Sequence, residues 1–156
     1  LLADGNTTAS MDISAFFGTA QVLDCSNFGS NEITGLEILD QLNLTEHPDF
    51  ILLYTGWSKK WGTENYFDLF PVASEDLIGT LAETKIKGIG LDTISLDSLN
   101  TNDLPNHKKF LGSDKIIIEN LTNLQKLMGK RFLFSCFPLK ILNGDASPVR
   151  AVGIID

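Results

Sequence analysis

Short apolar runs, separated by turns and helix-like segments, constrain the fold of this chain most. Phe50–Tyr54 reads FILLY, and Ile116–Ile118 follows the turn-forming sequence Gly112-Ser113-Asp114. Runs of this length that are apolar throughout are typical of strands buried on both faces of a sheet. Between them, Ser74 stands before Glu75 and Asp76, which is the pattern of a helix N-terminus. This alternation predicts an α/β domain with a mixed β-sheet and flanking helices.

The same patterns give approximate bounds for each element. Six strands are predicted, with Lys115–Glu119 taken as a central one: Thr19–Cys25, Phe50–Tyr54, Ile89–Leu96, Lys115–Glu119, Arg131–Phe137 and Val149–Ile155. Three helices are predicted: one over 35–42 after Thr34, one after Ser74, and one over Leu121–Leu127 that begins at Asn120 or Thr122 and ends at Gly129.

The composition is that of one globular domain. A chain of 156 residues with 43% hydrophobic residues can bury a core, so we expect a single domain over residues 1–156. No apolar run approaches the roughly 20 residues that span a bilayer. The net charge of −8 argues against binding to nucleic acid or to anionic membranes. Cys25 and Cys136 lie in apolar runs and are expected to be buried free thiols, so we expect a cytoplasmic protein.

A histidine and a carboxylate form the candidate metal site. Glu119 directly follows the apolar run Ile116–Ile118, and His107 lies twelve positions earlier. An acid at the end of a buried strand must be solvated, paired or bound to a cation. Imidazole with carboxylate is a ligand pair that zinc or manganese accepts. The alternative is an exposed turn histidine and a strand-end glutamate that faces water.

Three further residues have candidate roles. Strand alternation places Asp92 on the apolar face of Ile94 and Leu96, where it either fixes a loop by hydrogen bonds, the favoured interpretation, or orients a metal-bound histidine. Trp57 follows a strand end and is expected near a substrate, since strand ends line clefts in α/β sheets. The other aromatic residues of the segment 57–67 are mostly assigned to the core. His47 is expected to be solvated.

Five segments together resemble the cyclase family, whose best-known activity is bacterial kynurenine formamidase. They are FFGTAQVLDCS (Phe16–Ser26), FILLYTGWSKKWGTENYF (Phe50–Phe67), KGIGLDTISLD (Lys87–Asp97), HKKFLGSDKIIIENLTNL (His107–Leu124) and FPLKILNGDASPVRAVGII (Phe137–Ile155). The resemblance implies a swivelling β/β/α fold and metal binding at His107 and Glu119. It also implies hydrolysis of an amide, such as the N-formyl group of formylkynurenine, with zinc or manganese, in dimers or tetramers.

The chain departs from that family in one respect. The family's signature H-x-x-T-H-x-D-x-P-x-H, which supplies most metal ligands and a catalytic histidine, has no counterpart here. We therefore expect a cyclase-like domain that lacks its N-terminal segment, is inactive alone, and associates with a second copy or with that segment. The alternative is a non-catalytic binding or structural subunit with the same fold and an incomplete metal site.

Overall fold

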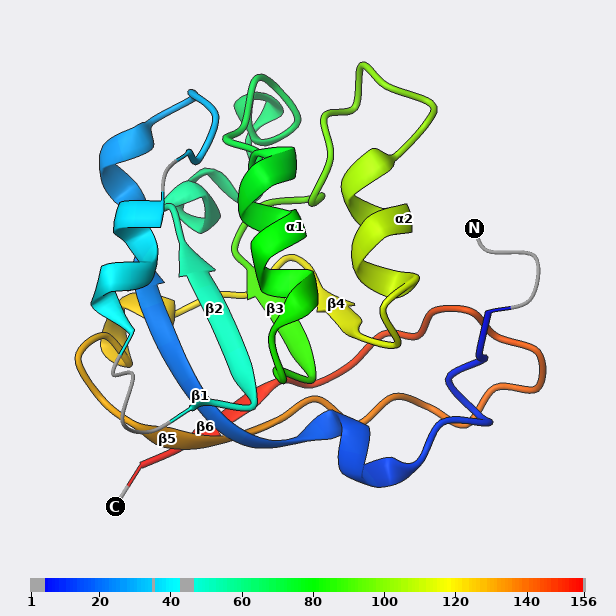
Figure 1. Cartoon of the computed structure of the whole chain (residues 1–156). Helices are drawn as coiled ribbons and strands as arrows, with labels where there is room; N and C mark the ends of the chain where they lie inside the picture. Colours follow the sequence, from blue (N-terminus) through cyan, green and yellow to red (C-terminus); the bar gives the residue numbers. More distant parts are fainter. Residues whose placement is uncertain (1–4, 35, 43–46, 156) are drawn as a thin grey trace.

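The core of the molecule is one six-stranded mixed sheet (Figure 1). The computed structural model describes residues 5–34, 36–42 and 47–155. The strands lie in the order β4-β3-β2-β1-β5-β6, in which β1 to β4 are parallel and β5 and β6 are antiparallel to their neighbours. Their bounds are Phe17–Asp24 for β1, Phe50–Tyr54 for β2, Gly88–Leu91 for β3, Ile116–Ile118 for β4, Phe132–Ser135 for β5 and Val152–Ile154 for β6. The expected α/β class with a mixed sheet is confirmed.

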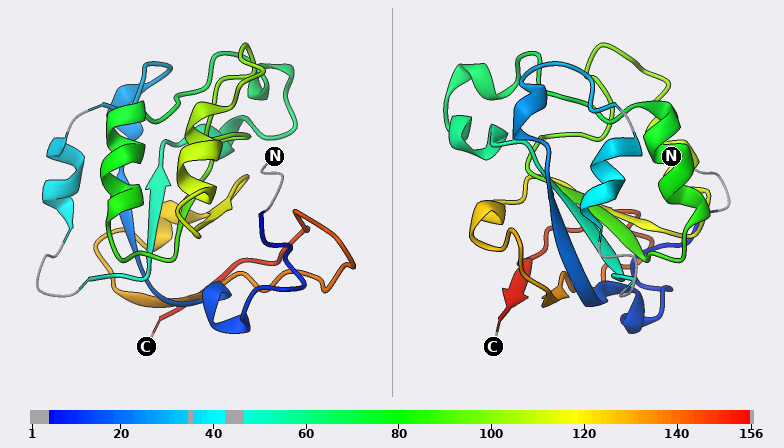
Figure 2. Two further views of the ribbon diagram at one scale, coloured as in Figure 1. Left: turned by 45° about the vertical axis from the view of Figure 1, so that its right-hand side comes forward. Right: turned by 60° about the vertical axis from the view of Figure 1, so that its left-hand side comes forward.

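Two α-helices stand side by side on one face of the parallel strands, as Figure 1 and the left view of Figure 2 show. They are α1 (Glu75–Glu83) and α2 (Pro105–Leu111). The helix α1 begins as predicted, because the Ser74 hydroxyl oxygen accepts a hydrogen bond from the Leu77 backbone N–H at 3.2 Å. Six short 3₁₀ turns complete the described elements: Ile13–Phe16, Ser26–Phe28, Leu36–Gln41, Trp57–Lys60, Glu64–Tyr66 and Leu124–Lys126.

Each face of the parallel strands has its own core. On one face, alternate strand residues such as Ile51 and Leu53 pack with Leu81 of α1 and Phe110 of α2. On the other face, Phe50 and Leu52 pack with residues of the returning chain and β5, among them Leu121, Leu124, Phe132 and Phe134. The strand β2 is therefore buried on both faces, which explains why its sequence is apolar throughout.

Several boundaries differ from those expected. The strand β3 ends at Leu91, not Leu96, and its parallel neighbour β4 is an edge strand, not a central one. After β4 the chain leaves the sheet, because Leu121 donates its N–H back to the Leu91 carbonyl and the next strand, β5, pairs with β1. The segments near 35–42 and 121–127 form 3₁₀ turns instead of α-helices.

The helix α2 was not predicted from the sequence. The one local signal is Pro105 at its start, a position where proline is favoured because its missing N–H is not needed. No helix in the described parts of the chain is long and apolar enough to cross a membrane.

Candidate metal-binding site

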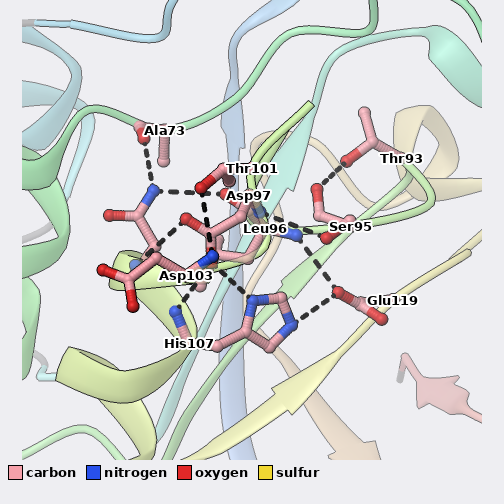
Figure 3. A network of polar contacts seen from close by, with 10 residues as sticks. Ala73, Thr93, Ser95, Leu96, Asp97, Thr101, Asp103, His107 and Glu119 are labelled. Atoms are coloured by element: carbon pink, nitrogen blue, oxygen red, sulfur yellow. Dashed lines mark hydrogen bonds and ion pairs between the residues drawn. The ribbon is translucent and has the colours of Figure 1, made fainter. Parts of the chain in front are cut away.

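His107 and Glu119 meet at the carboxyl edge of the parallel strands (Figure 3). His107 lies in the first turn of α2, and Glu119 directly follows β4, the strand that α2 precedes in the chain. The His107 Nε2 atom lies 3.1 Å from the Glu119 Oε1 atom. That oxygen also accepts a hydrogen bond from the Leu96 backbone N–H at 3.1 Å, so the carboxylate is held from a second side. The sequence-predicted pair is therefore brought together.

Asp97 contacts the other side of the same imidazole. Its Oδ2 atom lies 2.7 Å from His107 Nδ1 and accepts the His107 backbone N–H at 3.0 Å. Its Oδ1 atom accepts the Asn106 backbone N–H, also at 3.0 Å. The side chain is only 2% exposed. Sequence reasoning missed Asp97, because the strand was expected to continue through Leu96 and the helix that positions these N–H donors was not foreseen.

The two carboxylates set the charge preference of the imidazole. Burial alone would lower the pKa of His107, but the hydrogen bonds and negative charges of Glu119 and Asp97 outweigh it. The pKa of His107 is therefore raised above its ordinary value. The negative charges of the two carboxylates favour a positive charge at the imidazole, either a proton or a metal ion.

The donor set fits a divalent ion. Two ligand atoms that share a tetrahedral zinc ion at about 2.1 Å each lie roughly 3.4 Å apart, so the Nε2–Oε1 separation of 3.1 Å would have to widen only slightly to admit the ion. A carboxylate on the opposite ring nitrogen is the usual support of a metal-binding histidine. Within the described residues, no group of three or more histidine, cysteine, aspartate or glutamate side chains is arranged to hold a metal. Metal binding by His107 and Glu119 stays a prediction.

Asp92 leaves the same edge of the sheet as Glu119, but its hydrogen bonds support a loop. Its Oδ1 atom accepts the Thr55 N–H at 2.8 Å and the Thr55 hydroxyl at 2.6 Å, and its Oδ2 atom accepts the Ser58 hydroxyl at 3.2 Å. The side chain is fully buried at the end of β3. Among the hydrogen bonds of the described residues, none joins Asp92 to His107. The carboxylate nearest His107 Nδ1 is that of Asp97.

The aromatic segment after β2 has a buried part and an exposed part. Trp57 is buried, donates its Nε1–H to the Tyr66 carbonyl at 2.9 Å, and is covered by Lys60 Nζ, 3.3 Å from the ring centroid. Trp61 is 68% exposed and Phe67 is 60% exposed. These two rings therefore lie outside the core, where most aromatic residues of the segment were expected. With Tyr66 they line a surface cavity of about 520 Å³.

Tyr66 connects this cavity to the candidate site. Its hydroxyl donates a 2.7 Å hydrogen bond to Asn120 Oδ1, and Asn120 directly follows Glu119. Burial, together with the negative charges of Asp92 and Glu119, raises the pKa of Tyr66 to about 12, so the hydroxyl keeps its proton. His47, by contrast, is exposed, as predicted.

Comparison with known proteins decides the family. Residues 1–98 of the 156 match the model of the family described as "Putative cyclase". The chain belongs to this family. A kynurenine formamidase of Bacillus mycoides is 31% identical over 150 residues, which are 96% of this chain and 68% of that protein. An uncharacterized protein of Methanocaldococcus jannaschii is 38% identical over 120 residues, which are 75% of this chain and 61% of that protein.

Solved structures of other proteins share the fold. Isatin hydrolase A from Labrenzia aggregata, bound to benzyl benzoate, superposes with a TM-score of 0.84 at 26% identity, over 97% of this chain and 66% of that one. A predicted metal-dependent hydrolase from Bacillus stearothermophilus gives a TM-score of 0.74 at 25% identity, over 96% and 70%. The chain spans about two thirds of the length of these relatives. The chain therefore matches solved structures of proteins named as hydrolases.

Proposed function

We propose that this chain forms the larger part of a metal-dependent hydrolase of the kynurenine formamidase type. Its reaction would be hydrolysis of the C–N amide bond of an arylformamide such as N-formylkynurenine. The observation that carries the proposal is the approach of His107 Nε2 to Glu119 Oε1 at 3.1 Å, at the carboxyl edge of the sheet. Open α/β sheets bind ligands at this edge. The match to proteins named kynurenine formamidase and isatin hydrolase supports it.

His107 and Glu119 would hold a zinc or manganese ion. When bound, such an ion polarises a carbonyl group and lowers the pKa of a bound water to about 7. The Leu96 N–H and the Asp97 carboxylate would keep the two ligand side chains in place before the ion arrives. Catalytic zinc sites usually take three protein ligands. The remaining ligand and the general base would therefore come from a segment or subunit that joins this chain, and these residues alone should not hydrolyse an amide.

The aromatic cavity gives the proposed substrate a place near the site. The exposed Trp61 and Phe67 rings would stack on the aryl group of the substrate, since offset or edge-to-face ring contacts contribute about 0.5–1.5 kcal/mol each. Trp57 would act beneath this surface, because its indole N–H holds the Tyr66 carbonyl. Tyr66, through Asn120, would fix the distance between the aryl group and Glu119. Because buried free cysteines suit a reducing compartment, a cytoplasmic location is part of the proposal.

The test is a set of single changes in the complete protein. His107→Ala removes one proposed metal ligand, and Glu119→Gln replaces the carboxylate of the other by a neutral amide; both residues lie outside the hydrophobic cores. We expect zinc or manganese content to fall and formamide hydrolysis to drop by about three or more orders of magnitude. His47→Ala is the matched control, since it removes the chain's other histidine from an exposed position, and it should leave both properties unchanged.

Each alternative outcome is informative. Equal losses at His47 and His107 would indicate general destabilisation without a specific site. Full metal content after Glu119→Gln would contradict the assignment of Glu119 as a metal ligand. A complete protein that binds the metal at His107 yet hydrolyses no formamide would favour the non-catalytic binding subunit.

A further inference from the structure

We propose that Asp97 is a positioning residue that fixes both the ring orientation and the tautomer of His107. The inference rests on the proposed function and adds a residue to it. The carboxylate would hold Nδ1–H of the imidazole, so that Nε2 presents its lone pair on the side of Glu119.

The geometry ties the ring to its own helix. Asp97 Oδ2 lies 2.7 Å from His107 Nδ1 and 3.0 Å from the backbone nitrogen of the same residue. Asp97 Oδ1 takes the backbone N–H of Asn106. One carboxylate therefore meets three nitrogens of the first turn of α2, two of them from His107. Rotation of the imidazole about its side-chain bonds would break the shortest of these contacts.

The segment that carries Asp97 is itself anchored. The Asp97 N–H donates to the Ser95 hydroxyl oxygen at 3.2 Å, and the Asn106 side-chain amide donates to the Leu96 carbonyl at 3.2 Å and the Ala73 carbonyl at 2.8 Å. The Asp97 side chain is 2% exposed, and the N–H groups of a helix start stabilise a buried negative charge. A carboxylate held this firmly can impose a direction on the histidine that it contacts.

The tautomer follows from donor and acceptor chemistry. An ionised carboxylate only accepts hydrogen bonds, and a neutral imidazole donates from one nitrogen and accepts at the other. Both His107 nitrogens face carboxylates, but the Asp97 contact is shorter, 2.7 Å against 3.1 Å, and Asp97 is more buried, 2% exposed against 29% for Glu119. The Nδ1–H form is therefore favoured, which directs the Nε2 lone pair toward Glu119, where a shared metal would bind.

Asp97→Asn separates positioning from simple packing. The amide keeps the shape of the carboxylate. Its single oxygen, however, cannot accept both the Asn106 backbone N–H and the hydrogen bonds from His107. When the amide nitrogen faces Nδ1, it favours the wrong tautomer, Nε2–H. In serine protease triads the same substitution leaves the geometry intact and costs about 10⁴-fold in kcat for this reason.

The matched control is Asp103→Asn, which makes the same chemical change on the same connection to α2. Asp103 is 79% exposed and pairs with Lys108, the residue after His107, without contacting the imidazole. Nitrogen-15 NMR of histidine-labelled, metal-free protein at alkaline pH reports the tautomer directly. The chain has two histidines, so His47→Ala assigns the signals.

We expect Nδ1–H for His107 in the native chain and in Asp103→Asn, and a shift toward Nε2–H in Asp97→Asn. In the complete protein, Zn²⁺ affinity measured by chelator competition should fall about 10–100-fold in Asp97→Asn alone. If Asp97→Asn does not fold, the native chain still decides the tautomer: Nε2–H there would overturn the proposal. So would an unchanged tautomer in a folded Asp97→Asn protein. If instead His107→Ala leaves Zn²⁺ binding intact, the proposed function fails and the tautomer result stands by itself.

Discussion

The parallel and antiparallel halves of the sheet differ in how many of their faces are covered. The parallel half, β1 to β4, is covered on one face by α1 and α2 and on the other by the returning chain, and it carries the His107–Glu119 site at its carboxyl edge. The antiparallel half, β5 and β6 beside the start of β1, packs against the core on one face only. Parallel strands connect through crossovers that cover their faces, whereas antiparallel pairs tolerate one open face. The half with both faces covered is the one that can hold a precise site.

The uncovered surface is continuous across three strands. Thr19 of β1 pairs with Leu133 of β5, which pairs with Ile154 of β6, and paired residues point to the same face. We define the open face as Phe17, Leu133, Phe137, Val152 and Ile154, each 39–51% exposed. The rings of Phe17 and Phe137 stack across it at 6.3 Å. Contiguous exposed apolar side chains of this kind mark surfaces that other protein surfaces cover.

The largest contrast between the halves should be in stability. Leu53→Ala removes a 1% exposed side chain between β2 and the helices, and we expect a loss of about 2–5 kcal/mol in the free energy of unfolding. Leu133→Ala makes the same change on the open face, where Leu133 is 42% exposed, and should cost well under half as much. Urea unfolding measured under one condition compares them. Equal losses would mean that both faces of the antiparallel half are covered in solution.

The sequence predicted the parallel half better than the site that it carries. Runs such as Phe50–Tyr54 are apolar because both faces of β2 are buried, so composition alone marks them as strands. The Ser74 cap likewise depends on neighbours in the sequence. The end of β3 could not be predicted from the local sequence. It depends on hydrogen bonds of the Asp92 carboxylate with Thr55 and Ser58, which lie more than thirty positions away.

For the site, the sequence predicted the two proposed metal ligands but not the residue that holds the histidine in place. His107 and Glu119 were found as a ligand pair, and the structure brings them to 3.1 Å. Asp97 was not found, because its role depends on the N–H groups of α2, whose only local signal was Pro105. Trp57 was chosen by its distance from a strand end. The hydrogen bond from Trp57 to the Tyr66 carbonyl folds this segment back on itself. That fold decides which of its aromatic rings face solvent, and the local sequence does not show it.

The open face should control assembly. We propose that the chain forms a dimer or tetramer through this face. Ile154→Asp places a charge on the edge strand β6, where the side chain is 51% exposed, and should weaken association by about 1.5–3 kcal/mol per buried side chain. Light scattering over a dilution series measures the change.

The control for assembly is Leu142→Asp, because Leu142 is 85% exposed in the loop before β6 and lies outside the open face. It should leave the assembly unchanged. A native chain that remains a stable monomer of 17.1 kDa at all concentrations would refute the expected role of the open face.

The smallest expected effect lies at the opposite, amino edge of the parallel half. Asp49 accepts the Thr19 N–H at 2.8 Å and pairs with Lys87 Nζ at 3.1 Å, joining the connection before β2 to β1 and to the start of β3. Burial works to raise the pKa of Asp49, but these hydrogen bonds and the Lys87 charge outweigh it, so the pKa is lowered from 3.8.

A lowered pKa in the folded chain means that the carboxylate stabilises the fold above about pH 4, and that this contribution disappears as pH falls through the lowered value. The Asp49 side chain is 34% exposed, and after solvent screening we expect at most about 1 kcal/mol. Asp49→Asn should therefore lower the melting temperature slightly at pH 7, with a difference that shrinks toward pH 2. Asp68→Asn, which makes the same change at an exposed position after the aromatic segment, is the control and should leave the melting temperature at pH 7 unchanged. A constant difference between native and Asp49→Asn chains across this range would show that Asp49 acts through shape alone, and that the parallel half is held at this edge without its charge.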